Sequence, residues 1–192
     1  MASRRDPARV HRPTKHELAA AVGKQVRDVI GPDLRILFCG INPGLYSGAV
    51  GHHFARPGNR FWKVLHRAGF TERVLFPHEE RQLLGVGIGI TNLVSRTTAS
   101  AAELGRDELR QGAMRLEGKV RRYQPAIVAF AGMGAYRVAY GRPRAGLGRQ
   151  PETLAGAVIW LLPNPSGAQA AYQLDALLRA FRALRRAARD SV

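Results

Sequence analysis

The chain has 192 residues, which is long enough for one well-buried domain, and its apolar content of 45% is ordinary for a globular protein. Its 30 lysine and arginine residues outnumber 14 acidic residues, and the formal net charge of +16 indicates a polyanionic partner, with nucleic acid favoured over an anionic membrane surface. The single cysteine, Cys39, excludes an intrachain disulfide and any zinc or iron–sulfur site built from several cysteines, and the lack of an apolar leader predicts a cytoplasmic protein, nucleoid-associated if bacterial.

The amino-terminal part of the chain divides into an arm and the start of a domain. Residues 1–13 carry four arginines and two prolines without periodicity, which predicts a disordered basic arm. Thr14 and Glu17 have the spacing of a capping box, so a helix is expected to begin there and to run to about Ile30. No linker divides residues 14–192, which are expected to form a single domain and a monomer.

Strands and helices are expected to alternate along this domain. Short apolar runs predict four strands, at 34–39, 87–91, 126–131 and 157–162. Helices are expected between and after them, at 57–69, 77–84, 107–123 and 134–140 and over a last leucine-rich stripe from Leu174 to Leu184. This order predicts an α/β protein with three layers, α/β/α, around a central four-stranded, mainly parallel sheet.

Two turns follow the first and the last of these strands. Asn42-Pro43-Gly44 ends the first apolar run, and Asn164-Pro165-Ser166-Gly167 ends the last. Because ligands bind at the carboxyl ends of strands in such sheets, the two turns predict one shared site. An asparagine has no useful pKa, so it would act by positioning a water or a substrate. The alternative is that both asparagines only bond to their own turns.

Three motifs in this order and spacing resemble one family. They are Gly40 to Gly44 (GINPG), Phe54 to Trp62 (FARPGNRFW) and Leu162 to Gly167 (LPNPSG). Together they resemble the mismatch-specific uracil-DNA glycosylase/thymine-DNA glycosylase family, over roughly residues 30–190. The resemblance implies the uracil-DNA glycosylase fold and a monofunctional base-excision enzyme. Such an enzyme flips uracil, or thymine, from a G·U or G·T mispair in double-stranded DNA and hydrolyses the N-glycosidic bond without metal or cofactor.

The resemblance also implies roles for residues near the first motif. Asn42 would be the catalytic residue that positions the attacking water, and Phe54 would stack on the flipped base. The backbone near Ile41 would contact the polar edge of the base. We add Tyr46 and Asn92 to the predicted base pocket; Asn92 ends the second strand and could equally be a satisfied turn residue.

The second motif is expected to begin the loop that enters the duplex, which comprises Asn164, Pro165, Ser166, Gly167, Ala168 and Gln169. Ala168 stands near the place where the family has a bulky leucine wedge. If Gln169 reads the orphaned guanine, excision should be strict for G·U. If it does not, uracil in A·U pairs and single strands should also be cut.

Phosphate contacts are expected from arginines near these loops, with ordinary solvated arginines as the alternative; the candidates are Arg56, Arg60, Arg142, Arg144 and Arg149. His52 and His53 could touch substrate or face water. The sequence has no pattern that supplies a third ligand, so a metal site is not expected there. Two other classes remain open: a catalytically silent lesion-binding protein, and a small-nucleotide-binding α/β protein, which would not need this charge.

Overall fold

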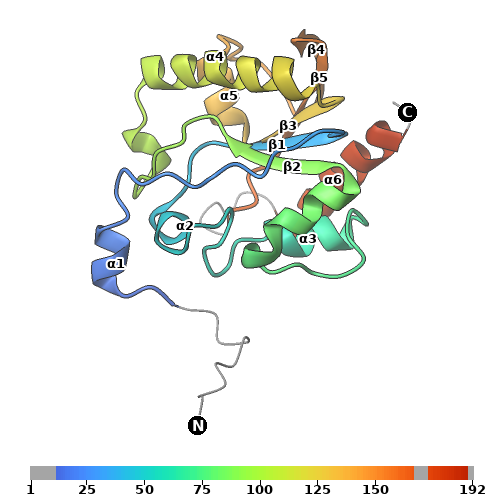
Figure 1. Ribbon diagram of the computed structural model, residues 1–192. Coiled ribbons are helices and arrows are strands. Elements are labelled where there is room, and N and C mark those ends of the chain that lie inside the picture. Colours follow the sequence, from blue (N-terminus) through green and yellow to red (C-terminus); the bar gives the residue numbers. More distant parts are fainter. Residues whose placement is uncertain (1–11, 167–172, 190–192) are drawn as a thin grey trace.

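The computed structural model describes residues 12–166 and 173–189, and its centre is a five-stranded sheet (Figure 1). The strands are β1 (Ile36–Gly40), β2 (Ile88–Asn92), β3 (Ile127–Ala131), β4 (Gly148–Leu154) and β5 (Ala157–Leu162). Their order is β2-β1-β3-β5-β4; every neighbouring pair is parallel except β4 and β5, which are antiparallel. The predicted α/β class and mainly parallel sheet are confirmed, with one strand more than the four expected.

Helices cover both faces of the sheet, which gives the predicted three layers. The α-helices are α1 (Lys15–Ala19), α2 (Leu45–Val50), α3 (Phe61–Arg67), α4 (Arg106–Tyr123), α5 (Met133–Ala139) and α6 (Leu174–Arg189), and two 3₁₀ helices span Pro77–Val86 and Ala101–Glu103. In Figure 1, α4 and α5 lie above the sheet and α3 and α6 below it. No helix within the described ranges is both long and apolar enough to cross a bilayer.

Each face of the sheet has its own apolar core, because successive strand residues point to opposite sides. Phe38 of β1 packs with Phe61 of α3 and Phe181 of α6 on one side. Leu37 and Cys39 belong to the core beneath α4 and α5. Cys39 is almost fully buried, and burial raises the pKa of its thiol, so this cysteine acts as a small apolar residue.

Two predicted helices are shorter than expected. The Thr14–Glu17 capping box is present, but α1 ends at Ala19, and the chain then reaches Gly23 with a φ of 76°. The segment after it is held by isolated bridges, Gln25 to Arg96 and Val29 to Ile90, so tertiary pairing overrides the helical pattern. Likewise, the helix predicted from Pro57 begins only at Phe61, because residues 57–60 form part of the pocket loop.

The parallel strands end together at one edge of the sheet. Gly40 of β1 is paired with Asn92 of β2, and Ala131 of β3 with Leu162 of β5. The loops that follow these residues therefore lie side by side, as the two asparagine turns predicted.

Candidate active site at the carboxyl edge of the sheet

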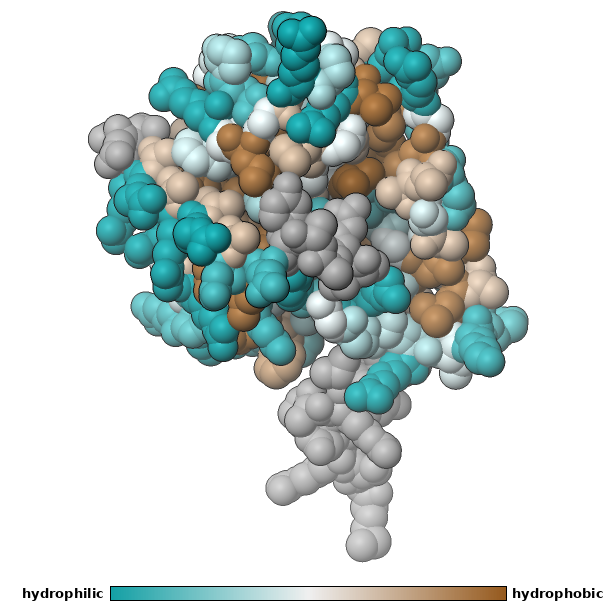
Figure 2. Space-filling view, turned by 180° about the vertical axis from the view of Figure 1, so that it is seen from behind, coloured by the Kyte–Doolittle hydropathy of each residue, from teal (hydrophilic) through white to brown (hydrophobic). Residues whose placement is uncertain are grey.

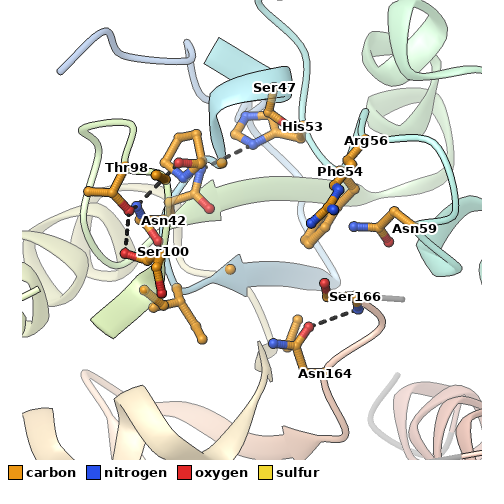
Figure 3. A pocket seen from close by; sticks show the side chains of 18 residues that line it. Asn42, Ser47, His53, Phe54, Arg56, Asn59, Thr98, Ser100, Asn164 and Ser166 are labelled. Atoms are coloured by element: carbon orange, nitrogen blue, oxygen red, sulfur yellow. Dashed lines mark hydrogen bonds between the residues drawn. The ribbon is translucent and has the colours of Figure 1, made fainter. Parts of the chain in front are cut away.

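A cavity of about 310 Å³ lies at this carboxyl edge. Its described lining comes from the end of β1 and the first motif, the loop 53–59, the end of β2, residues 98–101 and the second motif. In Figure 3, Asn42 lies on one side with Thr98 and Ser100, while Phe54 and Asn59 lie opposite and Asn164 and Ser166 form a third group. The two asparagine turns thus share one site.

The amide nitrogen of Asn42 is held by three acceptors. Its Nδ2 lies 2.7 Å from Thr98 Oγ1, 3.1 Å from the Arg96 carbonyl oxygen and 3.2 Å from the Pro43 carbonyl oxygen. Carbonyl oxygens can only accept, and Thr98 Oγ1 already donates to the Ser100 carbonyl oxygen at 2.8 Å. The network therefore fixes which amide atom is nitrogen, and it leaves Asn42 Oδ1 as an acceptor for a ligand at the cavity.

Phe54 supplies an aromatic wall. Its ring stacks on Phe61 of α3, with 4.0 Å between centroids and 19° between planes, and it is half-buried at the cavity. Its φ of 52° is in the left-handed region, which is uncommon for a residue with a large side chain. The surrounding loop must hold this conformation, and it does so through fixed hydrogen bonds.

Those hydrogen bonds run to Glu80 and Ser47. Glu80 is buried and accepts from the backbone N–H of His53 at 2.8 Å and from His52 Nδ1, 2.9 Å away. Ser47 Oγ of α2 accepts from the N–H of Ala55 at 3.2 Å. The loop that carries Phe54 is thus fixed on both sides of the ring.

His53 is 2% exposed and sets the orientation of Asn92. His53 Nε2 lies 3.1 Å from the Arg27 carbonyl oxygen, so it must donate its proton there. The other ring nitrogen, Nδ1, then accepts from Asn92 Nδ2 at 3.2 Å. Burial lowers the pKa of His53, with the Glu80 carboxylate opposing the shift, which favours this neutral tautomer.

Asn92 consequently directs its Oδ1 toward the end of β1. A Cβ built on Gly40 would collide with Asn92 Oδ1 and would lie 3.6 Å from Phe54 Cζ. Glycine at position 40 therefore makes room for both side chains at the floor of the cavity. The cavity is thus lined by two asparagines, Asn42 and Asn92, whose amide nitrogens are engaged and whose oxygens are left as acceptors.

Arg60, which follows the loop that carries Phe54, bonds to the second motif. Its guanidinium donates to the carbonyl oxygens of Ser166, at 3.2 Å, and Pro165, at 3.4 Å, and its N–H also donates to Pro165. Asn164 Oδ1 accepts from the Ser166 N–H at 2.9 Å, which is the turn role considered above. Gly167, Ala168 and Gln169, the rest of the predicted insertion loop, lie outside the described residues.

Other predicted site residues lie elsewhere. Tyr46 is half-buried on α2 and does not line the cavity, whereas its neighbour Ser47 does. Arg56 lines the cavity and is exposed, and its contact with phosphate stays a prediction. Arg142 donates to Glu152 at 3.0 Å and lies with Arg144 in a separate hollow, and Arg149 is on the outer strand β4. The structure does not bring these three to the pocket.

Sequence reasoning missed Thr98 and the buried role of His53. Both roles arise because residues 96–100 and 52–54 fold back to the end of β1. No periodicity in the sequence predicts these contacts. The nearest signal in the sequence is a threonine pair, Thr97 and Thr98, a few residues after the end of β2.

The chemistry of the described lining is dominated by amides and hydroxyls. None of the 18 described lining residues carries a carboxylate, and Arg56 is the permanent charge among them. Within the described ranges no three His, Cys, Asp or Glu side chains gather as metal ligands would. The site is suited to orient a neutral nucleophile, and Asn59 and Asn164, whose oxygens accept from nearby backbone N–H groups, leave their Nδ2 groups as donors for developing negative charge.

Comparison with known proteins adds two findings. The solution NMR structure of a candidate uracil DNA glycosylase from Methanosarcina acetivorans has a similar fold, with a TM-score of 0.59 and 19% sequence identity over 85% of this chain and 99% of that chain. The family model of the uracil DNA glycosylase superfamily matches residues 27–187. Since this match spans most of the chain, the protein belongs to the uracil DNA glycosylase superfamily.

Proposed function

We propose that this protein is a monofunctional DNA glycosylase that extrudes uracil from DNA and hydrolyses its N-glycosidic bond, leaving an abasic site. One observation carries the proposal: the amide nitrogen of Asn42 is bonded to three acceptors, and this fixes the side chain so that Oδ1 is left as an acceptor at the cavity. Membership of the superfamily and the net charge of +16 support it.

The extruded base would enter between Phe54 and the end of β1. One face of the Phe54 ring is packed on Phe61, so the ring is a rigid stacking platform. Asn92 Oδ1 would accept from the N3–H of uracil. Cytosine has no proton at N3, so the same oxygen would oppose its lone pair and favour uracil.

The water would be held by Asn42 Oδ1, and the reaction would depend on the leaving group. Oδ1 accepts a hydrogen bond from the water and directs the water oxygen at C1′ as the bond to the base breaks. Water supplies hydroxyl to C1′ and releases its other proton to solvent, while the base departs with the bonding electron pair and is protonated by solvent after the bond has broken. Because the described lining offers no carboxyl group to protonate it, the base leaves as an anion stabilised by hydrogen-bond donors.

Preference for mispaired uracil is the finer part of the proposal. A G·U pair opens more readily than A·U, which lowers the free energy of extrusion. With alanine at position 168, the wedge is small, and activity on A·U pairs and single strands is the alternative outcome.

The test is excision on labelled G·U, A·U and G·T duplexes and on single-stranded uracil, scored as alkali-labile sites. We expect cleavage of G·U, with intact strands before alkali. Tight binding without excision of any substrate would point to the silent lesion-binding protein instead.

A leaving-group series tests the mechanism on the same duplex. 5-Fluorouracil should leave faster than uracil, and thymine should leave slowest, because the rate follows the stability of the departing anion. Equal single-turnover rates would show that the bond to the base is not breaking in the rate-limiting step.

A further inference from the structure

A second basic site lies at the opposite edge of the sheet from the cavity. Two adjoining hollows, of about 350 and 370 Å³, share Gly69, Arg185 and Arg189. The second is lined in part by Ile36 and Ile88, which begin β1 and β2. Gly40 and Asn92, at the other ends of these strands, line the candidate active site, about 13 Å away along the strand.

Six arginines surround these hollows, and we call them the arginine cleft: Arg35, Arg67, Arg182, Arg185, Arg186 and Arg189. Arg185 is half-buried, and its guanidinium packs closely over Gly69. A Cβ at position 69 would lie only 3.0 Å from the guanidinium carbon. The other five are exposed. Figure 2, which views the molecule from behind, shows hydrophilic side chains gathered at the left, where α6 ends.

The charge of the cleft exceeds what the fold itself neutralises. Arg182 Nη2 reaches the Arg67 carbonyl oxygen at 3.5 Å, near the end of α3, and Arg35 Nη2 donates to the Val86 carbonyl oxygen. Within the described ranges none of the six forms a salt bridge. Glu72 is the one carboxylate among the described lining residues, and the carboxyl ends of α3 and α6 add about −0.5 each.

Roughly four positive charges therefore remain unbalanced. Counting Asp190, which follows Arg189 outside the described residues, would leave about three. Capping of helix ends accounts for one or two of these arginines and not for the set.

The arrangement of the cleft matches a repeating phosphate backbone. Arg182, Arg186 and Arg189 lie at i, i+4 and i+7, so they follow one another on one face of α6 over a rise of about 10.5 Å, a length over which one nucleic-acid strand presents several phosphates. Guanidinium groups bind phosphate oxygens in pairs, which favours arginine over lysine here. Ala68 and Gly69 also line the first hollow, and their small size leaves the space between the arginines open.

We propose that the arginine cleft binds the phosphates of a second nucleic-acid segment, distinct from the one whose base enters the cavity. The helix α6 leads away from the carboxyl edge, so its last turn lies away from the cavity that takes the extruded base (Figure 1). The second segment would let the protein pass between duplexes without first dissociating. This inference concerns binding alone and does not depend on excision.

The experiment measures binding of a second duplex. Protein is saturated with a short G·U duplex whose deoxyuridine carries a 2′-fluorine, which resists hydrolysis, and a labelled undamaged 12-base-pair duplex is then titrated. The cleft variant carries Arg67→Gln, Arg182→Gln, Arg186→Gln and Arg189→Gln. The matched control removes four exposed arginines of α4, Arg110, Arg115, Arg121 and Arg122, in the same way.

We expect the cleft variant to bind the second duplex at least about tenfold more weakly, with a salt dependence shallower by roughly 3 to 4 in log–log slope. The control should stay within about twofold of the parent. The double variant Arg186→Gln/Arg189→Gln, confined to the last turn of α6, should give about half the change in slope and covers the case in which the full variant does not fold.

Equal second-duplex binding by the cleft variant and the control would overturn the proposal. Displacement of the labelled duplex by poly-glutamate as readily as by DNA of equal charge would assign the cleft to an acidic protein instead. Excision on a short G·U duplex is measured in parallel. If the parent excises no base, but binds the second duplex more tightly than the cleft variant does, the proposed function fails while this inference stands.

Discussion

The two Asn-Pro turns at the carboxyl edge have nearly the same sequence, yet each leaves a different amide atom for a ligand. Asn42 uses its nitrogen, bonded to Pro43, Arg96 and Thr98, and leaves its oxygen at the cavity. Asn164 uses its oxygen, which accepts from the Ser166 N–H. Asn42 can therefore orient a water through an acceptor, whereas Asn164 shapes the turn with its oxygen and leaves its amide N–H groups as donors.

The difference arises from tertiary partners and not from the turns themselves. Asn42 meets the loop 96–100, which returns to the end of β1 and supplies two of its acceptors. Asn164 has a local partner two residues later, as an Asx turn provides. A motif thus predicts the place of a functional amide, while the long-range contacts decide which atom acts.

The largest expected effect separates these two asparagines. Asn42→Ala should reduce single-turnover excision of uracil by at least about a hundredfold, because the water loses its acceptor. Asn164→Ala should cost less than about tenfold, since it removes a turn bond. Duplex affinity, measured on the same preparations, should change little for Asn42→Ala. Similar losses for both variants would erase the distinction.

A smaller effect is expected from Thr98, which accepts from Asn42 Nδ2. Thr98→Val keeps the shape and removes the acceptor, and it should lower the excision rate by about tenfold through misorientation of the amide. Thr97→Val is the matched control, because Thr97 Oγ1 donates to the Lys24 carbonyl oxygen away from the cavity. It should lower the melting temperature without the same loss of rate. Parent-like excision by Thr98→Val would show that the amide needs no such support.

The smallest effect concerns the third amide, Asn92, and the histidine that orients it. Burial lowers the pKa of His53 in the folded state, so folding disfavours its protonated form. Its contribution to stability is complete above the ordinary value of about 6.5 and is lost as pH falls through the lower folded value. Denaturant unfolding between pH 7.5 and 5.5 should therefore show a steeper loss of stability for the parent than for His53→Gln. The exposed His78→Gln should keep the parent slope; a parent slope in both variants would mean that His53 does not titrate as described.

Much of the fold could be predicted from the sequence. Four apolar runs are strands, and the periodic segments near 107–123 and 174–184 are the helices α4 and α6. The strand β4 was missed because Gly148–Leu154 has no apolar run and contains Pro151, which an edge strand tolerates. The first helix was predicted too long because pairing of Gln25 and Val29 with distant backbone outweighs local helical preference.

The candidate site also has features that the sequence predicts and features that it does not. The positions of Asn42, Phe54, Asn92 and Asn164 at one cavity follow from strand ends and motif order. Tyr46 was predicted to belong to the pocket, but the short helix α2 directs Ser47 there instead. The engagement of Asn42 by Thr98 and of Asn92 by His53 could not be predicted, because each contact joins segments 39 or more residues apart.

The most direct test of a positioned amide oxygen is the pH dependence of Asn42→Asp. An aspartate would place its second oxygen among the acceptors that now hold Nδ2, so only the protonated carboxyl group can keep this arrangement. The ratio of variant to parent single-turnover excision rate should therefore rise as pH falls from 8 to 5. A ratio that rises with pH would identify residue 42 as a general base or charge stabiliser, and would contradict the account.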